Sequence, residues 1–210
     1  MTELYFVRHG ETENNQRQLM NGGAVDTPLT AKGVRGAKAV GQYLRQLAFK
    51  VCYVSPQKRA QTTAQLILAQ SQQPSPPTEV AEGLREFDMG DWDGRPISDL
   101  PQNQDLDNYL HHPERWTGEV TGGESYHHLI QRGEAAINQI VAAYPHERVL
   151  VVSHGVLLQT TLNSLRGYPL NEVRSSPRLA NCSVTIFSAT APDNYHCQLW
   201  NQTDFQHPLS

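Results

Sequence analysis

"LYFVRHGETENN", residues 4–15, starts as an apolar segment and ends as a cluster of polar and charged groups. Residues 4–7 are apolar and rich in strand formers, so they predict a buried β-strand. Arg8, His9 and Gly10 follow without a break and place two basic side chains on a flexible turn directly after a core strand. In open α/β sheets, ligands bind at the carboxyl ends of the strands, so this stretch predicts both a fold class and a binding edge.

Short apolar runs and helical patterns alternate along the rest of the chain. Such alternation predicts crossover units, a mostly parallel central sheet and helices on both of its faces, which together form a three-layer α/β sandwich. Further strands are predicted at residues 51–54, 148–152 and 183–187, with an edge strand at 195–200. Helices are predicted from Thr30, from Ser55, over residues 124–144 and over residues 155–165.

Length and charge narrow the class of protein. The chain has 210 residues, which favours a single domain over residues 1–210. Residues 97–123 are irregular and are predicted to cross one edge of the sheet and to form part of a lid. Residues 203–210 are predicted as a polar tail. The net charge of −4 argues against nucleic-acid binding.

The cysteines and the apolar runs indicate the cellular compartment of the protein. Three cysteines with no CxxC spacing predict reduced thiols in place of a disulfide framework or a zinc knuckle. No basic region followed by an apolar region opens the chain, and no apolar run is long enough to span a bilayer. We therefore expect a cytoplasmic protein without membrane contact. The sequence carries no signal for its oligomeric state.

Two more predicted strands end in basic residues. "SPQKRAQTT" follows the predicted strand at 51–54 and places Arg59 in the first turns of a helix, and "SHG" places His154 at the end of the predicted strand at 148–152. Arginine forks match phosphate oxygens, and helix N-termini add N–H donors, so this edge of the sheet predicts a pocket for a phosphate dianion. A histidine among arginines tends to be neutral, and a neutral imidazole can attack phosphorus.

A leaving alkoxide needs a proton, and "LREFDMGDWDG", residues 84–94, is crowded with carboxylates. Glu86 lies between apolar residues and could occupy a partly apolar wall that favours its protonated form. Spacing alone does not select Glu86 over Asp88. For Asp91 we expect a solvated turn position.

Five motifs in order give the sequence a family resemblance. "VRHGETENN" fits R-H-G-[EQ]-x-x-x-N, "SPQKRAQTT" fits S-x-x-x-R-x-x-x-T, and "LREFDMGDWDG" fits L-x-E-x-x-x-G-x-W-[ED]-G. "GGES" at residues 122–125 and "VVSHG" at residues 151–155 complete the set. Over nearly its whole length the chain resembles the histidine phosphatase superfamily, which has the phosphoglycerate mutase-like fold, and within it the broad-specificity phosphatases.

The resemblance implies a role for each matching residue. His9 would be the nucleophile that becomes phosphorylated. Glu86 would give a proton to the leaving oxygen and later take one from the attacking water. Positive charge would come from the protein itself, so neither a metal ion nor another cofactor is implied. The implied phosphate pocket consists of Arg8, Arg59, His154 and the amide of Asn15.

The activity implied by this resemblance is metal-independent hydrolysis of small-molecule phosphate monoesters. A cofactor-dependent phosphoglycerate mutase is the first alternative. Mutases of the family have an acid segment of the L-N-E-R-H-Y-G kind, whereas "FDMGDWDG" follows Glu86 here. A mutase must also hold a bisphosphate and exclude water, which calls for extra cations and a closing lid. Residues 97–123 carry Arg115 and few other cations, which favours the phosphatase.

Two further alternatives are a non-catalytic phosphate-binding protein and a metal site formed by histidines. A non-catalytic phosphate-binding relative would have lost its nucleophile or its acid, but both are present in the sequence. Nine histidines raise the question of a metal site. The pairs His111-His112 and His127-His128 are adjacent in sequence, unlike the i, i+4 pair of a helical zinc site. His127 or His128 could still reach the active site, although a surface position is favoured.

Overall fold

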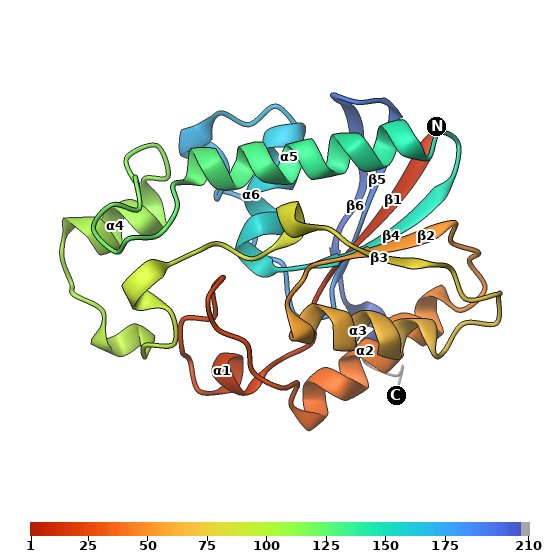
Figure 1. Ribbon diagram of the computed structural model, residues 1–210, viewed down its shortest axis with the longest axis horizontal. Coiled ribbons are helices and arrows are strands. Elements are labelled where there is room, and N and C mark those ends of the chain that lie inside the picture. The colour runs from red at the N-terminus through yellow and green to blue at the C-terminus, as the bar shows by residue number, and fades with distance from the viewer. Residues whose placement is uncertain (207–210) are drawn as a thin grey trace.

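The computed structural model describes residues 1–206 and contains one sheet of six strands in the order β3-β2-β4-β1-β5-β6 (Figure 1). The four neighbouring strands β3, β2, β4 and β1 run parallel, and β5 and β6 extend the sheet by antiparallel pairing. The strands are β1 (Thr2–Arg8), β2 (Val51–Val54), β3 (Thr78–Val80), β4 (Arg148–Ser153), β5 (Val184–Ala191) and β6 (Asn194–Gln202). The mostly parallel α/β sandwich predicted from the sequence is confirmed.

Helices cover both faces of this sheet. Figure 1 shows α2 and α3 below the sheet and α5 and α6 above it. The α-helices are α1 (Glu13–Gln16), α2 (Ala31–Leu44), α3 (Lys58–Leu68), α4 (Gln104–His111), α5 (Tyr126–Ala143) and α6 (Gly155–Leu165). Short 3-10 helices are η1 (Glu82–Leu84), η2 (Gly90–Trp92), η3 (Ile97–Asp99), η4 (Leu170–Glu172) and η5 (Asp204–Gln206). Thr30 caps α2 as predicted, because its side chain accepts a hydrogen bond from the Gly33 N–H.

The alternation of β1 explains why the sheet has a core on each face. Leu4 and Phe6 belong to one buried cluster with α5 and α6, whereas Tyr5 and Val7 belong to a second cluster with α2 and α3. Successive strand residues point to opposite faces, so a strand that is apolar at every position must be covered on both.

The segment 97–123 is more ordered than the sequence suggested. It contains η3 and α4, and its apolar side chains Leu106, Tyr109 and Trp116 are buried in the same cluster as the α5 side of the sheet. Figure 1 places α4 on the side of the molecule toward which β1 and its parallel neighbours run. The prediction of an irregular segment was therefore wrong for Gln104–His111, and a lid formed by residues 97–123 stays a prediction.

The end of the described chain packs against α2. Phe205 stacks on Tyr43 with ring centroids 4.5 Å apart, and the Gln206 side chain donates to the Cys182 carbonyl. Of the predicted polar tail, residues 207–210 lie outside the described residues. The three cysteines are free thiols, as predicted. Within residues 1–206, the structure holds no helix with the length and apolar character needed to cross a membrane.

Candidate active site

The site begins where β1 and β4 end side by side. Arg8 is in register with Ser153, and the His9 N–H donates to the Ser153 carbonyl at 2.9 Å. The residues that follow these strands, His9 and His154, consequently lie against each other, with ring centroids 5.2 Å apart. The sequence therefore predicted correctly that these two strands bring their histidines together.

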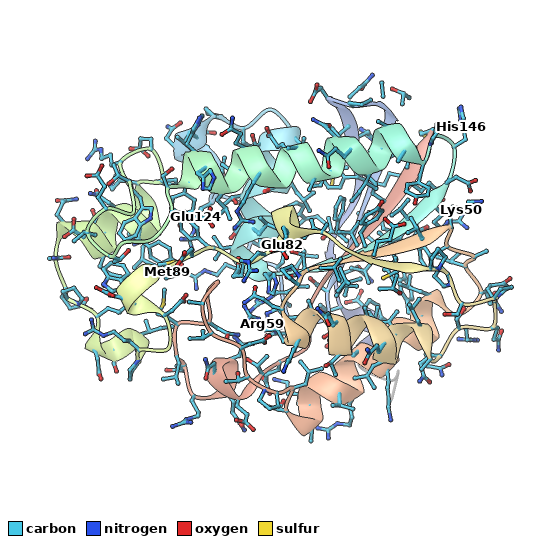
Figure 2. All side chains as sticks on the ribbon, in the orientation of Figure 1. Lys50, Arg59, Glu82, Met89, Glu124 and His146 are labelled. Carbon is cyan, nitrogen blue, oxygen red and sulfur yellow. The ribbon has the colours of Figure 1, made fainter. Side chains whose placement is uncertain are left out.

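A cavity of about 360 Å³ opens at this edge. Four of the predicted site residues line it, namely Arg8, His9, Asn15 and Glu86. Apolar side chains form much of the remaining wall, and they come from the residues after α1, from the segment after Glu86 and from 97–110. Figure 2 shows one of them, Met89, beyond Arg59 toward α4.

His9 presents one ring nitrogen to this cavity. Its Nδ1 lies 2.7 Å from the Gly10 carbonyl oxygen, which can only accept, so Nδ1 carries the proton and Nε2 carries the lone pair. Nε2 has no hydrogen-bond partner within residues 1–206 and is not buried. Burial, and then the charges of Arg59 and Arg8, hold the pKa of His9 well below its usual value. The imidazole is therefore neutral, with its lone pair accessible.

Arg59 and His154 lie in a buried layer behind His9 and do not line the cavity. The Arg59 Nε donates to His154 Nδ1 at 3.3 Å, and His154 Nε2 lies 2.7 Å from the Ser55 hydroxyl. Burial, and then the charge of Arg59, lower the pKa of His154 well below its usual value. His154 is thus a neutral imidazole that is held by partners on both ring nitrogens.

The guanidinium of Arg59 is fully engaged with protein groups. Besides His154, it donates to four oxygens of the loop after α1, namely the carbonyls of Asn21, Gly22 and Val25 and the carboxylate of Asp26. In this structure its charge therefore acts on the site from directly behind the nucleophile candidate. Arg8, by contrast, reaches the cavity itself.

Arg8 and Asn15 supply the donors at the cavity wall. Arg8 Nη1 donates to the Leu179 carbonyl at 2.6 Å, which leaves Nη2 unpaired within the described residues and reachable from the cavity. A Cβ at Gly155 would lie 3.0 Å from Arg8 Nε, so a glycine there lets Arg8 pass over the start of α6. The Asn15 Oδ1 accepts from the Thr12 N–H and the Asn181 amide, so its NH₂ group is the end left for a ligand.

Glu86 is the one carboxylate of residues 84–94 that lines the cavity, whereas Asp88 and Asp91 are exposed. Its surroundings differ from the apolar wall expected from the sequence. Backbone N–H groups of Phe87, Val156 and Leu157 donate to its two oxygens at 2.9–3.1 Å. Two of these donors belong to the first turn of α6, so the helix N-terminus holds Glu86 at the cavity wall.

Several residues that position the site were quoted in motifs but not predicted as functional. Thr63 accepts from the Gly10 N–H and donates to the Arg59 carbonyl, which ties the turn after β1 to α3. Gln57 donates to the carbonyls of the loop that binds Arg59 and accepts from the Glu86 N–H at 2.9 Å. For Thr63, the motif spacing was a signal of such a role, because Thr63 lies one helical turn after Arg59 on the same helix face.

Asp93 holds the same loop from the other side. Its carboxylate accepts from the Gly22 and Ala24 N–H groups, each at 2.8 Å. Burial raises the pKa of Asp93 to about 6, although these two N–H donors oppose the change.

None of the other histidines within residues 1–206 lines the cavity. His127 lines a separate surface pocket, and His128 pairs with Glu124 at 3.1 Å on an exposed face of α5. His112 is flanked by Asp107 and Glu114 on the surface. Within residues 1–206, no three His, Cys, Asp or Glu side chains are grouped as a metal ion would require.

The lowered pKa values predict that His9 and His154 resist protonation in mild acid. A depressed pKa means that the proton binds only as the pH falls well below about 6.5. We expect the ¹⁵N imidazole signals of His9, identified by their loss in His9→Ala, to stay those of the Nδ1–H tautomer from about pH 8 to about pH 5.5, while free imidazole compounds titrate. Titration of His9 near pH 6.5 would contradict the burial argument.

Comparisons with known proteins show what this chain is similar to. A family model described as the histidine phosphatase superfamily (branch 1) matches residues 4–203. The chain is 35% identical over 167 residues to the adenosylcobalamin/alpha-ribazole phosphatase of Escherichia coli (strain K12), covering 79% of this chain and 80% of that protein. It is 35% identical over 185 residues to the probable phosphoglycerate mutase GpmB of Proteus mirabilis (strain HI4320), covering 88% of this chain and 84% of that protein.

The solved structures include a near match over the whole fold. Bacillus stearothermophilus YhfR aligns with a TM-score of 0.90 and 30% identity, over 99% of this chain and 100% of that one. The match extends from the first strand, which delivers Arg8 and His9, to the last. The chain therefore belongs to the histidine phosphatase superfamily.

Proposed function

We propose that this protein hydrolyses phosphate monoesters of small molecules through a phosphohistidine intermediate on His9. One observation carries the proposal. The Gly10 carbonyl fixes the His9 proton on Nδ1, so that the Nε2 lone pair faces the cavity under the influence of the charges of Arg59 and Arg8. A neutral imidazole beside fixed cations is suited to attack a phosphate dianion.

The first half of the reaction forms the phosphoenzyme. His9 Nε2 bonds to phosphorus, and the bond from phosphorus to the ester oxygen breaks. The carboxyl group of Glu86 gives its proton to the departing oxygen. Arg8 Nη2 and the Asn15 amide contact the phosphoryl oxygens, and Arg59 stabilises their charge from behind His9. Because these groups are fixed by backbone partners, little reorganisation is needed as charge develops.

The second half returns the enzyme to its starting state. A water molecule gives a proton to the Glu86 carboxylate and attacks phosphorus as the bond to His9 Nε2 breaks. Inorganic phosphate leaves, and Glu86 is protonated again for the next turnover. The same carboxyl group thus serves as acid in the first half of the reaction and as base in the second.

The mutase alternative has some support from the relative named as a probable phosphoglycerate mutase. Besides Arg115 in residues 97–123, the chain has two further cations near the site, because Arg174 and Arg178 line the cavity. We favour hydrolysis because much of the wall beyond Glu86 is apolar, as at Leu100 and Leu106, and an apolar wall does not suit a second phosphate dianion.

The test is an assay of phosphate release from a panel of esters that includes 3-phosphoglycerate, sugar phosphates and α-ribazole phosphate. We expect release from several esters, and we expect it to persist in EDTA. With 3-phosphoglycerate and 2,3-bisphosphoglycerate together, phosphate release should exceed isomerisation. Isomerisation faster than release would favour the mutase, and activity that EDTA removes and a metal ion restores would contradict the metal-independent reaction.

A further inference from the structure

Arg174 is a second arginine on the cavity wall, and it lies outside all five motifs. It follows η4, and its backbone carbonyl accepts from the Gln159 side chain on α6. Val156, whose N–H holds Glu86, lies three residues before Gln159 on the same helix. At about 1.5 Å per residue, Gln159, which holds the Arg174 backbone, is about one helical turn from Val156, which holds Glu86. One small molecule can span that separation.

The guanidinium of Arg174 is held in one orientation. Its Nη1 donates to the Tyr109 carbonyl at 2.9 Å and to the Tyr126 hydroxyl. Its Cζ lies 5.0 Å from the centre of the Tyr109 ring and 5.7 Å from that of Tyr126. The Tyr126 ring packs against Phe87, the neighbour of Glu86, at 4.7 Å. The guanidinium is therefore fixed through aromatic packing to the segment that carries the acid.

This anchoring leaves one edge of the guanidinium without a partner. Within residues 1–206, Nε and Nη2 of Arg174 make no hydrogen bond of regular geometry, although the Tyr109 hydroxyl lies beside the guanidinium, and neither nitrogen is among the unpaired atoms that are buried. The edge formed by Nε and Nη2 presents two parallel N–H groups, which is the geometry that accepts the two oxygens of a carboxylate. Because Arg174 lines the cavity, this edge is open to a bound molecule.

Arg174 also lacks a counter-charge. No carboxylate of residues 1–206 lies within 4.0 Å of it, whereas Arg59, Arg132 and Arg148 each pair with one. Partial burial beside aromatic rings removes water from the Arg174 guanidinium, which costs free energy. An anion bound in the cavity would offset that cost.

We propose that Arg174 binds a carboxylate carried by the leaving group of the phosphate ester. The proposal rests on the proposed function, because it places the phosphoryl group at His9. The ester would span the cavity, with its body against apolar side chains such as Leu106 and its acid on Arg174. The Nε–Nη2 edge of one guanidinium, with its two parallel N–H groups, matches the two oxygens of a planar carboxylate.

Binding can be measured without turnover by using phosphonates, which cannot be hydrolysed. We would titrate the protein with benzylphosphonate, with its 4-carboxy derivative and with its neutral 4-carboxamide. For the wild-type protein we expect the carboxylate to improve Kd about 10- to 100-fold over the carboxamide, as bidentate charge-assisted bonds do. In Arg174→Gln, which keeps a donor for the Tyr109 carbonyl, that advantage should disappear while benzylphosphonate binds within about threefold of wild type.

Three outcomes would overturn the proposal. They are no carboxylate advantage in the wild-type protein, an advantage that survives in Arg174→Gln, and an equal loss of all three ligands in that variant, which would indicate a purely structural role. Arg115→Gln, on the exposed arginine beside Glu114, is the matched control and should change no Kd. Hydrolysis of phenyl phosphate by the wild-type protein tests the proposed function separately, since that ester carries no carboxylate.

Discussion

His9→Ala is expected to lower kcat/KM for every phosphate monoester by a factor on the order of 10⁴ or more. Alanine removes the only atom that the proposed mechanism bonds to phosphorus, and the charges of Arg8 and Arg59 alone cannot replace a nucleophile. The measurement is phosphate release under saturating and limiting substrate. Rapid alkaline quenching of the reaction with a ³²P-labelled ester should in addition trap labelled wild-type protein, with the label stable to base and lost in acid, and no label on the variant.

The control for this experiment is His128→Ala, which removes an exposed imidazole on α5 and should leave the rate unchanged. Folding is checked by circular dichroism, because His9 is buried and its removal leaves a small cavity. A folded His9→Ala variant with near wild-type activity would show that another group attacks phosphorus.

Glu86→Gln is expected to separate substrates by their leaving groups. Alkyl phosphates need a proton on the departing oxygen, so their kcat should fall about 10²- to 10⁴-fold. p-Nitrophenyl phosphate leaves as a stable phenolate, and its phosphorylation step should fall less than about tenfold. The two esters are compared by pre-steady-state bursts, since the loss of the general base also slows the water step for both.

Asp88→Asn is the matched control, because Asp88 is an exposed carboxylate two residues from Glu86 in the same segment. It should leave both esters unaffected. The amide of Glu86→Gln can keep an oxygen for the Phe87 and Leu157 N–H groups, so the fold is expected to persist. Equal losses in the phosphorylation of both esters would remove Glu86 from the role of acid.

The sequence predicted the sheet well because core strands carry a dense apolar signal. The elements it missed carry little of that signal. β3 has three residues and all are exposed, so its pairing with β2 depends on backbone hydrogen bonds that no side-chain pattern records. α4 is mostly polar and buries only Leu106 and Tyr109, too few positions to stand out as a helical stripe.

The sequence also predicted which functional groups meet, but not how each is used. Arg59 lies behind His9 because carbonyl groups of the loop after α1 bind its guanidinium. Those carbonyls belong to Asn21 and Gly22, which are not part of any motif. That Glu86 sits on a helix N-terminus follows from a contact across 70 positions of chain. Arg174 lay in a polar stretch without pattern, and only its bonds to Tyr109 and Tyr126 single it out.

Different segments of the chain supply the reacting groups and the rest of the cavity wall, and this separation affects how substrate specificity can change. The strand ends and the first turns of α3 and α6 hold the reacting groups, whereas two other segments, residues 97–110 and 174–179, supply much of the rest of the wall. Neither segment contributes a strand to the sheet. Substitutions in these two segments, natural or engineered, can therefore change the substrate specificity while the reacting groups stay the same.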